Sequence, residues 1–137
     1  MYGSNYFNHT VSDHLSSIKD LLQIFAISSI SPFKSFEDLD IRVGTIIHAE
    51  RFEEAIKPSY KLKIDFGELG ILKSSAQITK KYTLEHLLGF QVIAVVNFPK
   101  KQIANFMSEC LVLGVVEDDS VVLLKPDSKT ENGLRIA

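Results

Sequence analysis

The stretch Tyr60-Lys61-Leu62-Lys63-Ile64-Asp65-Phe66 decides the fold class, because apolar and charged residues alternate through it without a break. Alternation with a period of two is the pattern of a β-strand that buries one face. Gly67 and Gly70 follow at once and predict a turn. We therefore expect a hairpin whose second strand covers residues 71–76.

Further strand patterns lie on both sides of this hairpin. Upstream, residues 41–49 alternate in the same way. Downstream, Thr83 and Gly89 are a suitable cap and stop for a short helix over residues 84–88. The remaining predicted strands are the apolar runs 91–97, 111–116 and 121–124, of which the last two form a hairpin around the acidic turn 117–120.

This order predicts a mainly β protein, namely a five-stranded Greek-key barrel of the OB-fold type with short helices. The period-two pattern by itself leaves an SH3-like barrel open. Before the barrel, apolar residues recur at helical spacing and predict an amphipathic helix over residues 13–27, with Ser12 as N-cap and Pro32 as a stop. We divide the chain into an N-terminal extension, 1–34, and a barrel domain, 35–137.

Composition and targeting signals point to one globular, cytoplasmic domain. Hydrophobic residues make up 45% and charged residues 23% of the 137 residues, which is ordinary for a folded domain. Polar residues interrupt the longest apolar stretch, 21–30, which is too short to cross a membrane. The N-terminus lacks the pattern of a secretory signal. The single cysteine, Cys110, lies in an apolar run and is expected to be a buried, inert thiol.

Charge is distributed unevenly along the chain. The net charge is −2, yet residues 57–101 contain eight lysines against three acids. The flanking segments 35–56 and 102–137 each contain six acids and fewer bases. A basic centre of this kind fits phosphate binding, although lysines that merely solvate the outer faces of strands would produce the same count.

Five blocks of sequence carry a resemblance to a known family. From residue 36 onward the chain resembles the tRNA-binding domain family, and within it the stand-alone CsaA type, which combines tRNA binding with a chaperone role in protein export. The blocks are DIRVGTI (40–46), KPSYKLKIDFG (57–67), KSSAQIT (73–79), VVNFP (95–99) and FMSECLVLG (106–114). The resemblance implies an OB barrel, a homodimer and a non-catalytic role in binding tRNA by its shape or its ends.

Two other functions stay open at this point. The resemblance also suggests a chaperone that binds unfolded or export-competent client proteins. A third alternative is an accessory subunit of an aminoacyl-tRNA synthetase. We expect tRNA and a second copy of the chain as partners, and no membrane.

The candidate tRNA-binding residues combine cations with groups that can stack on a base or form hydrogen bonds to RNA. Lys57 and Lys61 are the first phosphate candidates. Tyr60 is either a stacking ring or, in phase with Leu62 and Ile64, a core residue. The full predicted set is Lys57, Tyr60, Lys61, Lys73, Ser74, Ser75, Gln77, Lys80, Lys81, Asn97, Lys100, Lys101, Met107 and Ser108.

Other chemistries lack their sequence signals. No nucleophile elbow surrounds Ser74 or Ser75, so we predict no enzyme activity. The four histidines show no metal-ligand spacing, and phosphate-cradling glycine motifs are absent, so we expect neither metal nor cofactor. Asn97 and the serines could equally be structural. An acid beside phosphate is unfavourable, so Glu109 is expected to hold lysine or backbone donors in place.

Overall fold

Residues 31–137 are described by the computed structural model, and the predicted helix over 13–27 lies outside them. Backbone contacts divide the chain into two units that meet between Leu39 and Asp40. Helix α2 (Pro32–Asp38) belongs to the N-terminal unit. Helix α2 was not predicted from the sequence: Pro32 suggests a helix stop, whereas proline also fits the first turn of a helix, as it does here.

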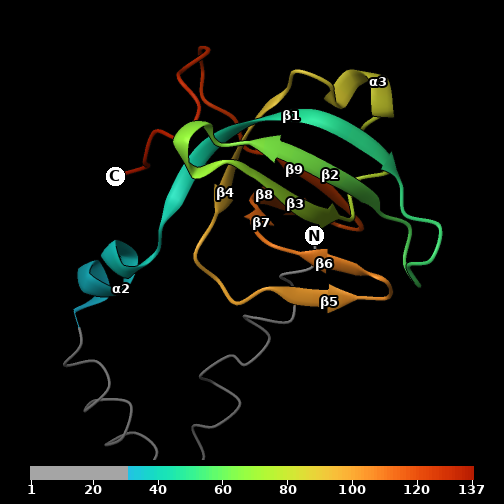
Figure 1. Ribbon diagram of the computed structural model, residues 1–137, viewed down its shortest axis with the longest axis horizontal. Coiled ribbons are helices and arrows are strands. Elements are labelled where there is room, and N and C mark those ends of the chain that lie inside the picture. Colours follow the sequence, from blue (N-terminus) through green and yellow to red (C-terminus); the bar gives the residue numbers. More distant parts are fainter. Residues whose placement is uncertain (1–30) are drawn as a thin grey trace, which may run out of the picture. The chain divides into compact units, whose positions relative to one another are not determined.

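The second unit is mainly β, and its strands follow in the order that Figure 1 labels. Its elements are β1 (Ile41–Arg51), β2 (Tyr60–Asp65), the short helix η3 (Gly67–Leu69), β3 (Ile71–Ala76), α3 (Leu84–Leu87), β4 (Gln91–Val95), β5 (Lys101–Ile103), β6 (Phe106–Ser108), β7 (Leu111–Val112), β8 (Gly114–Glu117) and β9 (Ser120–Leu123). Among these elements, β5 with β6 and β8 with β9 form two separate hairpins.

Five strands pair antiparallel in the order β3-β2-β1-β4-β7 and form a nearly closed barrel. The long strand β1 pairs with β4 over its first half and with β2 over its second half, so it belongs to both sides of the barrel. The register shifts between Ile46 and His48, where a bulge bends the strand. This architecture confirms the predicted mainly β, OB-type barrel.

The barrel closes between β3 and the segment that enters β7. There the backbone N–H of Glu109 donates to the carbonyl oxygen of Lys73 at 2.7 Å. Side chains complete the seam: the N–H of Ser75 donates to Ser108 Oγ at 3.1 Å, and Ser74 Oγ donates to the carbonyl of Cys110 at 3.1 Å. Buried hydroxyls therefore replace part of a regular strand ladder, which satisfies backbone groups that would otherwise be unpaired.

The core fills the barrel with the inward residues of the alternating strands. Leu62, Ile64 and Phe66 are completely buried. Gly44 of β1 lies against this group, and a Cβ atom there would approach Ile64 Cγ2 to 2.6 Å. The glycine is therefore required by close packing, since real Cβ contacts are longer.

Two local predictions are confirmed, one is wrong, and one hairpin was missed. The Oγ1 atom of Thr83 accepts from the N–H of His86, and Gly89 ends the turn with φ +81°. The predicted strand 111–116 is two strands instead, because β7 pairs with β4 while β8 turns away to pair with β9. The hairpin over residues 101–108 was not predicted, and its turn has Ala104 at φ +49° rather than a glycine.

Candidate nucleic-acid interface

The outer face of strands β2 and β3 carries three lysines close together. Since Tyr60, Leu62 and Ile64 point into the core, Lys61 and Lys63 between them point outward. Lys63 lies directly opposite Lys73 in the β2–β3 register, and Lys61 lies opposite Ser75. Like charges directly opposite each other destabilise a sheet. We call Lys61, Lys63 and Lys73 the lysine face.

Two phenylalanine rings lie beside the lysine face. Phe52 follows β1 and is buried, whereas Phe106 of β6 is partly exposed. Their ring centroids are 5.4 Å apart, with the rings inclined at 63° in an edge-to-face contact. Lys61 Nζ lies 4.9 Å from the centroid of Phe52 and 5.7 Å from that of Phe106, and Lys73 Nζ lies 5.3 Å from that of Phe106. These are cation–π distances.

Carboxylates neutralise the lysine face only in part. Lys61 Nζ lies 3.6 Å from a carboxylate oxygen of Glu54. Within residues 31–137, Lys63 and Lys73 form no ion pair. Glu109 Oε1 accepts from the backbone N–H of Lys73, while its other oxygen lies 3.3 Å from Lys100 Nζ. Glu109 thus holds a backbone donor and a lysine, as expected, and leaves the ammonium groups of Lys63 and Lys73 with net positive charge.

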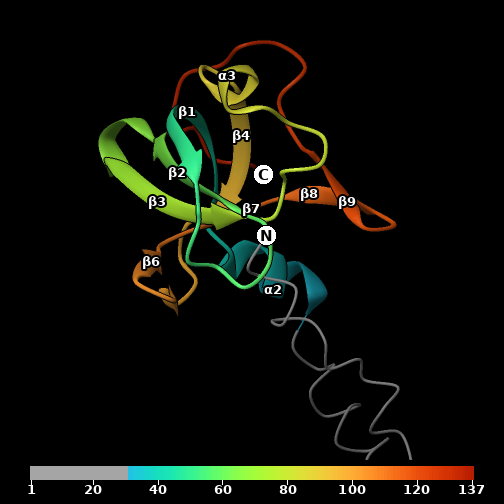
Figure 2. The same ribbon diagram turned by 90° about the vertical axis from the view of Figure 1, so that its right-hand side faces the viewer.

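Two connections frame the lysine face. One is the β1–β2 loop, which supplies Phe52, and the other is the β4–β7 connection, which contains hairpin β5–β6 and supplies Phe106 (Figures 1 and 2). The outer face of strands two and three and the corresponding loops hold oligonucleotides in OB folds. The position of the cluster within the fold therefore matches the binding face of this fold type.

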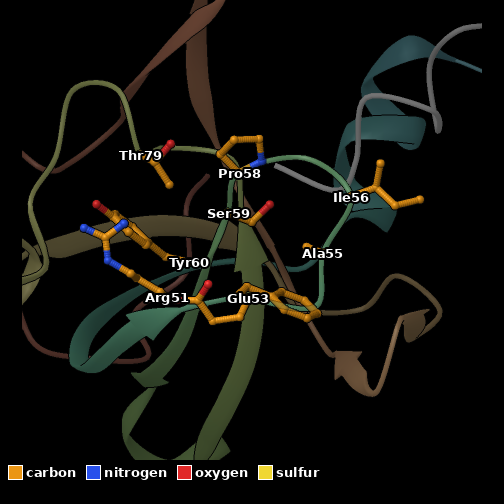
Figure 3. A pocket seen from close by; sticks show the side chains of 9 residues that line it. Arg51, Glu53, Ala55, Ile56, Pro58, Ser59, Tyr60 and Thr79 are labelled. Atoms are coloured by element: carbon orange, nitrogen blue, oxygen red, sulfur yellow. The ribbon is translucent and has the colours of Figure 1, made fainter.

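A pocket lies at the base of the β1–β2 loop, next to the framed face (Figure 3). Its wall includes the side chain of Arg51, the ring of Tyr60 and Thr79 from the segment after β3. Phe52 also lines the pocket, so this ring belongs both to the pocket wall and to the cation–aromatic cluster. Ile56 and Pro58 extend the wall along the exposed loop.

The serines of the predicted site lie inside the molecule. Ser74 and Ser108 are completely buried and Ser75 is 4% exposed. The hydroxyl groups of Ser74 and Ser108 form hydrogen bonds that close the barrel, while Ser75 contributes its backbone N–H. Gln77, just after β3, is partly exposed.

Tyr60 is a core residue, which agrees with the second of the two interpretations from the sequence. Its side chain is 4% exposed, and its hydroxyl donates to the carbonyl oxygen of Tyr82 at 2.8 Å. The hydroxyl of Tyr82 in turn accepts from the N–H of Leu123 at 2.9 Å. The two tyrosines therefore connect β2 to β9 through the segment before α3.

Lys80 and Lys81 lie apart from the lysine face and pair with the β8–β9 hairpin. Lys80 forms an ion pair with Asp119, and Lys81 Nζ lies 2.9 Å from Glu117. The hydrogen bond from Lys80 lowers the pKa of Asp119, and the bond to Glu117 raises the pKa of Lys81. Figure 2 shows hairpins β5–β6 and β8–β9 projecting on different sides of the barrel.

The remaining predicted residues lie in the β1–β2 loop and in the connection from β4 to β7. Lys57 is exposed in the β1–β2 loop. Asn97 accepts a hydrogen bond from the N–H of Asp40 at 2.9 Å, which fixes the end of β4. Lys101 lies opposite Ser108 in the β5–β6 register, and Met107 of β6 is partly exposed. Contact of these residues with RNA stays a prediction.

Three residues of the cluster were missed from the sequence as site residues: Phe52, Lys63 and Phe106. Lys63 lies two residues after Lys61 in the alternating pattern, so the sequence already placed both side chains on the same outer face. The two rings gave no such signal, because they are far apart in the chain and meet only when β6 folds beside β3.

The described residues hold no group of three histidine, cysteine or acidic side chains arranged as metal ligands. In the same part of the chain, none of the helices has the length and apolar character of a membrane span.

Comparison with known proteins supports an RNA-binding class. A family model described as a putative tRNA binding domain matches residues 41–135. The methionine–tRNA ligase of Methanothrix thermoacetophila is 36% identical over 107 residues, which cover 78% of this chain and 16% of the ligase. The chain therefore belongs to the putative tRNA binding domain family.

Within this family the chain is similar to CsaA. The crystal structure of the chaperone CsaA from Bacillus anthracis has 55% sequence identity and a TM-score of 0.75, with 78% of this chain and 98% of that chain covered. The CsaA chaperone of Picrophilus torridus is also 55% identical, with a TM-score of 0.73 over 77% of this chain and 97% of that one. The resemblance inferred from the five sequence blocks is thus confirmed.

Proposed function

We propose that the protein is a non-catalytic tRNA-binding protein that holds RNA phosphates on the lysine face. The observation that carries the proposal is the Lys63–Lys73 cross-strand pair. The two lysines lie directly opposite each other in the strand register, and neither has an ion-paired carboxylate within residues 31–137, an arrangement that costs stability in the free protein. A bound polyanion removes this cost, because each phosphate neutralises an ammonium group and releases its own counterions.

Family and fold support the same function. The matching family is described as a putative tRNA binding domain, and the cluster lies on the face that OB folds use for oligonucleotides. Since tRNA is the expected ligand, we place the protein in the cytoplasm.

A mobility-shift titration with total tRNA and with duplex DNA of matched length, at two salt concentrations, tests the proposal. A plot of the logarithm of affinity against the logarithm of salt concentration should fall linearly. If three phosphates contact the lysine face, these contacts should contribute about −2 to its slope. The double change Lys61→Ala and Lys73→Ala should reduce both affinity and slope. A matched change at Lys129, an exposed lysine near the C-terminus, should alter neither. Absence of tRNA binding at low salt would refute the proposal.

A second candidate is a chaperone that holds unfolded clients, because both 55% identical structures are called chaperones. Apolar client binding should persist as salt rises, whereas phosphate binding should weaken steeply. A permanently reduced and alkylated unfolded protein is a suitable probe. Salt-resistant binding of this probe, together with failure to bind tRNA, would favour the chaperone function. An accessory role beside a synthetase is a third proposal, supported by the similarity to methionine–tRNA ligases.

We also propose that the protein is a homodimer, as the similarity to CsaA suggests. The β8–β9 hairpin presents Val115 and Val116, which are 53% and 74% exposed. Neighbouring apolar side chains of this kind are covered in many assemblies. Sedimentation equilibrium of the whole chain measures the oligomeric state, and a monomer at micromolar concentration would contradict this part of the proposal.

A further inference from the structure

The ring of Phe106 lies close to one aromatic ring and two ammonium groups. One partner is the edge contact with Phe52, and the others are the ammonium groups of Lys61 and Lys73. The ring is partly exposed, while Phe52 behind it is buried. The β5–β6 hairpin therefore presents one aromatic surface beside Lys61 and Lys73, with the buried ring of Phe52 in contact with it.

The interactions of Lys73 in the free protein are weak and replaceable. Its ammonium group forms no ion pair with any residue from 31 to 137, and it lies 5.3 Å from the ring centroid of Phe106. A cation–π contact at an exposed site is weaker than a charge-assisted hydrogen bond to phosphate. A phosphate near the lysine face should therefore draw this ammonium group away from the ring.

A nucleotide supplies both groups that the exchange requires. Its phosphate offers oxygens to the lysines, and its base offers a π-face to the ring that they leave. Bases inside a duplex are already stacked on their neighbours, so only an unpaired base can take this place. A site of this kind would discriminate between single-stranded and paired RNA by the availability of the base, without hydrogen bonds to its edge.

We propose that Phe106, Lys61 and Lys73 form a site for one unpaired nucleotide, whose base stacks on Phe106 while its phosphate binds the two lysines. The inference rests on the proposed function and deepens it, since it names the part of the RNA that the lysine face recognises. Phe52 is a positioning residue in this site, because its contact with Phe106 fixes the stacking surface.

The test compares three RNA probes by fluorescence anisotropy with the full-length protein. The first is an oligoadenylate of about eight nucleotides, a length within the usual site sizes of OB folds. The second has the same number of phosphates but abasic riboses, and the third is a duplex with a matched number of phosphates. Stacking of one base should make the oligoadenylate bind about 5- to 150-fold more tightly than the abasic probe.

Variants separate the ring from the charges. Phe106→Leu should abolish the preference for the oligoadenylate and leave binding of the abasic probe unchanged, which also shows that the lysine face is intact. Phe106→Tyr should retain the preference, because it keeps the ring. Lys73→Ala should weaken binding of all three probes and keep the preference for a base. Phe33→Leu, a change in α2, is the matched control and should alter nothing.

The outcomes distinguish the two proposals. Equal binding of the oligoadenylate and abasic probes would overturn the nucleotide site and leave the tRNA-binding proposal standing. A base preference that survives Phe106→Leu would also overturn it. If neither tRNA nor any of the three probes binds at low salt, the proposed function itself fails.

Discussion

Replacing Lys63 by glutamine should make the protein more stable and, at the same time, a weaker RNA binder. In the free protein Lys63 faces Lys73 across the strand pair, and neither residue forms an ion pair within the described chain. Directly opposed like charges cost about 0.2–1 kcal/mol relative to neutral pairs. Glutamine keeps the length and polarity of the side chain but removes one charge, so it should recover this free energy.

The expected shift is measurable by urea denaturation. With a gain of about 0.5 kcal/mol and a slope of about 1.5 kcal/mol per molar urea, the midpoint should rise by about 0.3 M. The gain should vanish near 1 M salt, where charges are screened beyond about 3 Å. Lys129→Gln is the matched control, because this lysine lies on no strand and should leave the midpoint unchanged.

The effect on binding has the opposite sign. Loss of one phosphate contact should make the slope of log affinity against log salt concentration less steep by about 0.7 for single-stranded RNA. Binding to tRNA is measured by mobility shift at several salt concentrations, with Lys129→Gln again as the control. A lower urea midpoint for Lys63→Gln, or a salt dependence identical to that of the control, would refute the reasoning from the cross-strand pair.

Three further changes test the barrel itself. Ser108→Ala leaves the buried N–H of Ser75 without its acceptor and should lower the free energy of unfolding by about 1–3 kcal/mol, measured in urea; an unchanged midpoint would contradict the role of this hydroxyl. Gly44→Ala pushes a methyl group against Ile64 and should cost about 1–3 kcal/mol in the same assay, so a stable variant would mean that the core adapts. Burial raises the pKa of the Cys110 thiol from 9.0 to about 12, so the unfolded thiol ionises first and stability should fall as pH rises through this range. Unfolding at successive pH values, compared with Cys110→Ala, checks that loss, and equal pH profiles would exclude it.

Local sequence patterns predicted most of the barrel, because they reflect local physics. Alternation in residues 60–66 indicated a strand and also which side chains face the core. Thr83 and Gly89 marked the ends of the short helix, since a side-chain acceptor and a positive φ are needed there. The family resemblance could also be recognised from the sequence alone, because its motifs are short and contiguous.

The errors arose where the local pattern shows neither which strand a segment pairs with nor how a turn is made. The apolar run 111–116 shows strand character but does not show that its first part pairs with β4 and its second with β9. The hairpin over residues 101–108 lacks a turn glycine, and Ala104 adopts a positive φ that its sequence context does not suggest. For the serines, the sequence left both an RNA-binding and a structural role open, and the fold decided this by placing Ser74 Oγ against the carbonyl of Cys110 and Ser108 Oγ against the N–H of Ser75.

The sequence by itself determined the strand pattern, the basic centre and the family, since each depends on residues that are neighbours in the chain. Only the tertiary structure decided which lysines act together. The β2–β3 register places Lys63 against Lys73, and the fold of β6 brings Phe106 to within 5.3 Å of the Lys73 ammonium group. The physical reason is that register and barrel closure result from burying a shared core, so the outward residues are brought together as a consequence of packing on the opposite face.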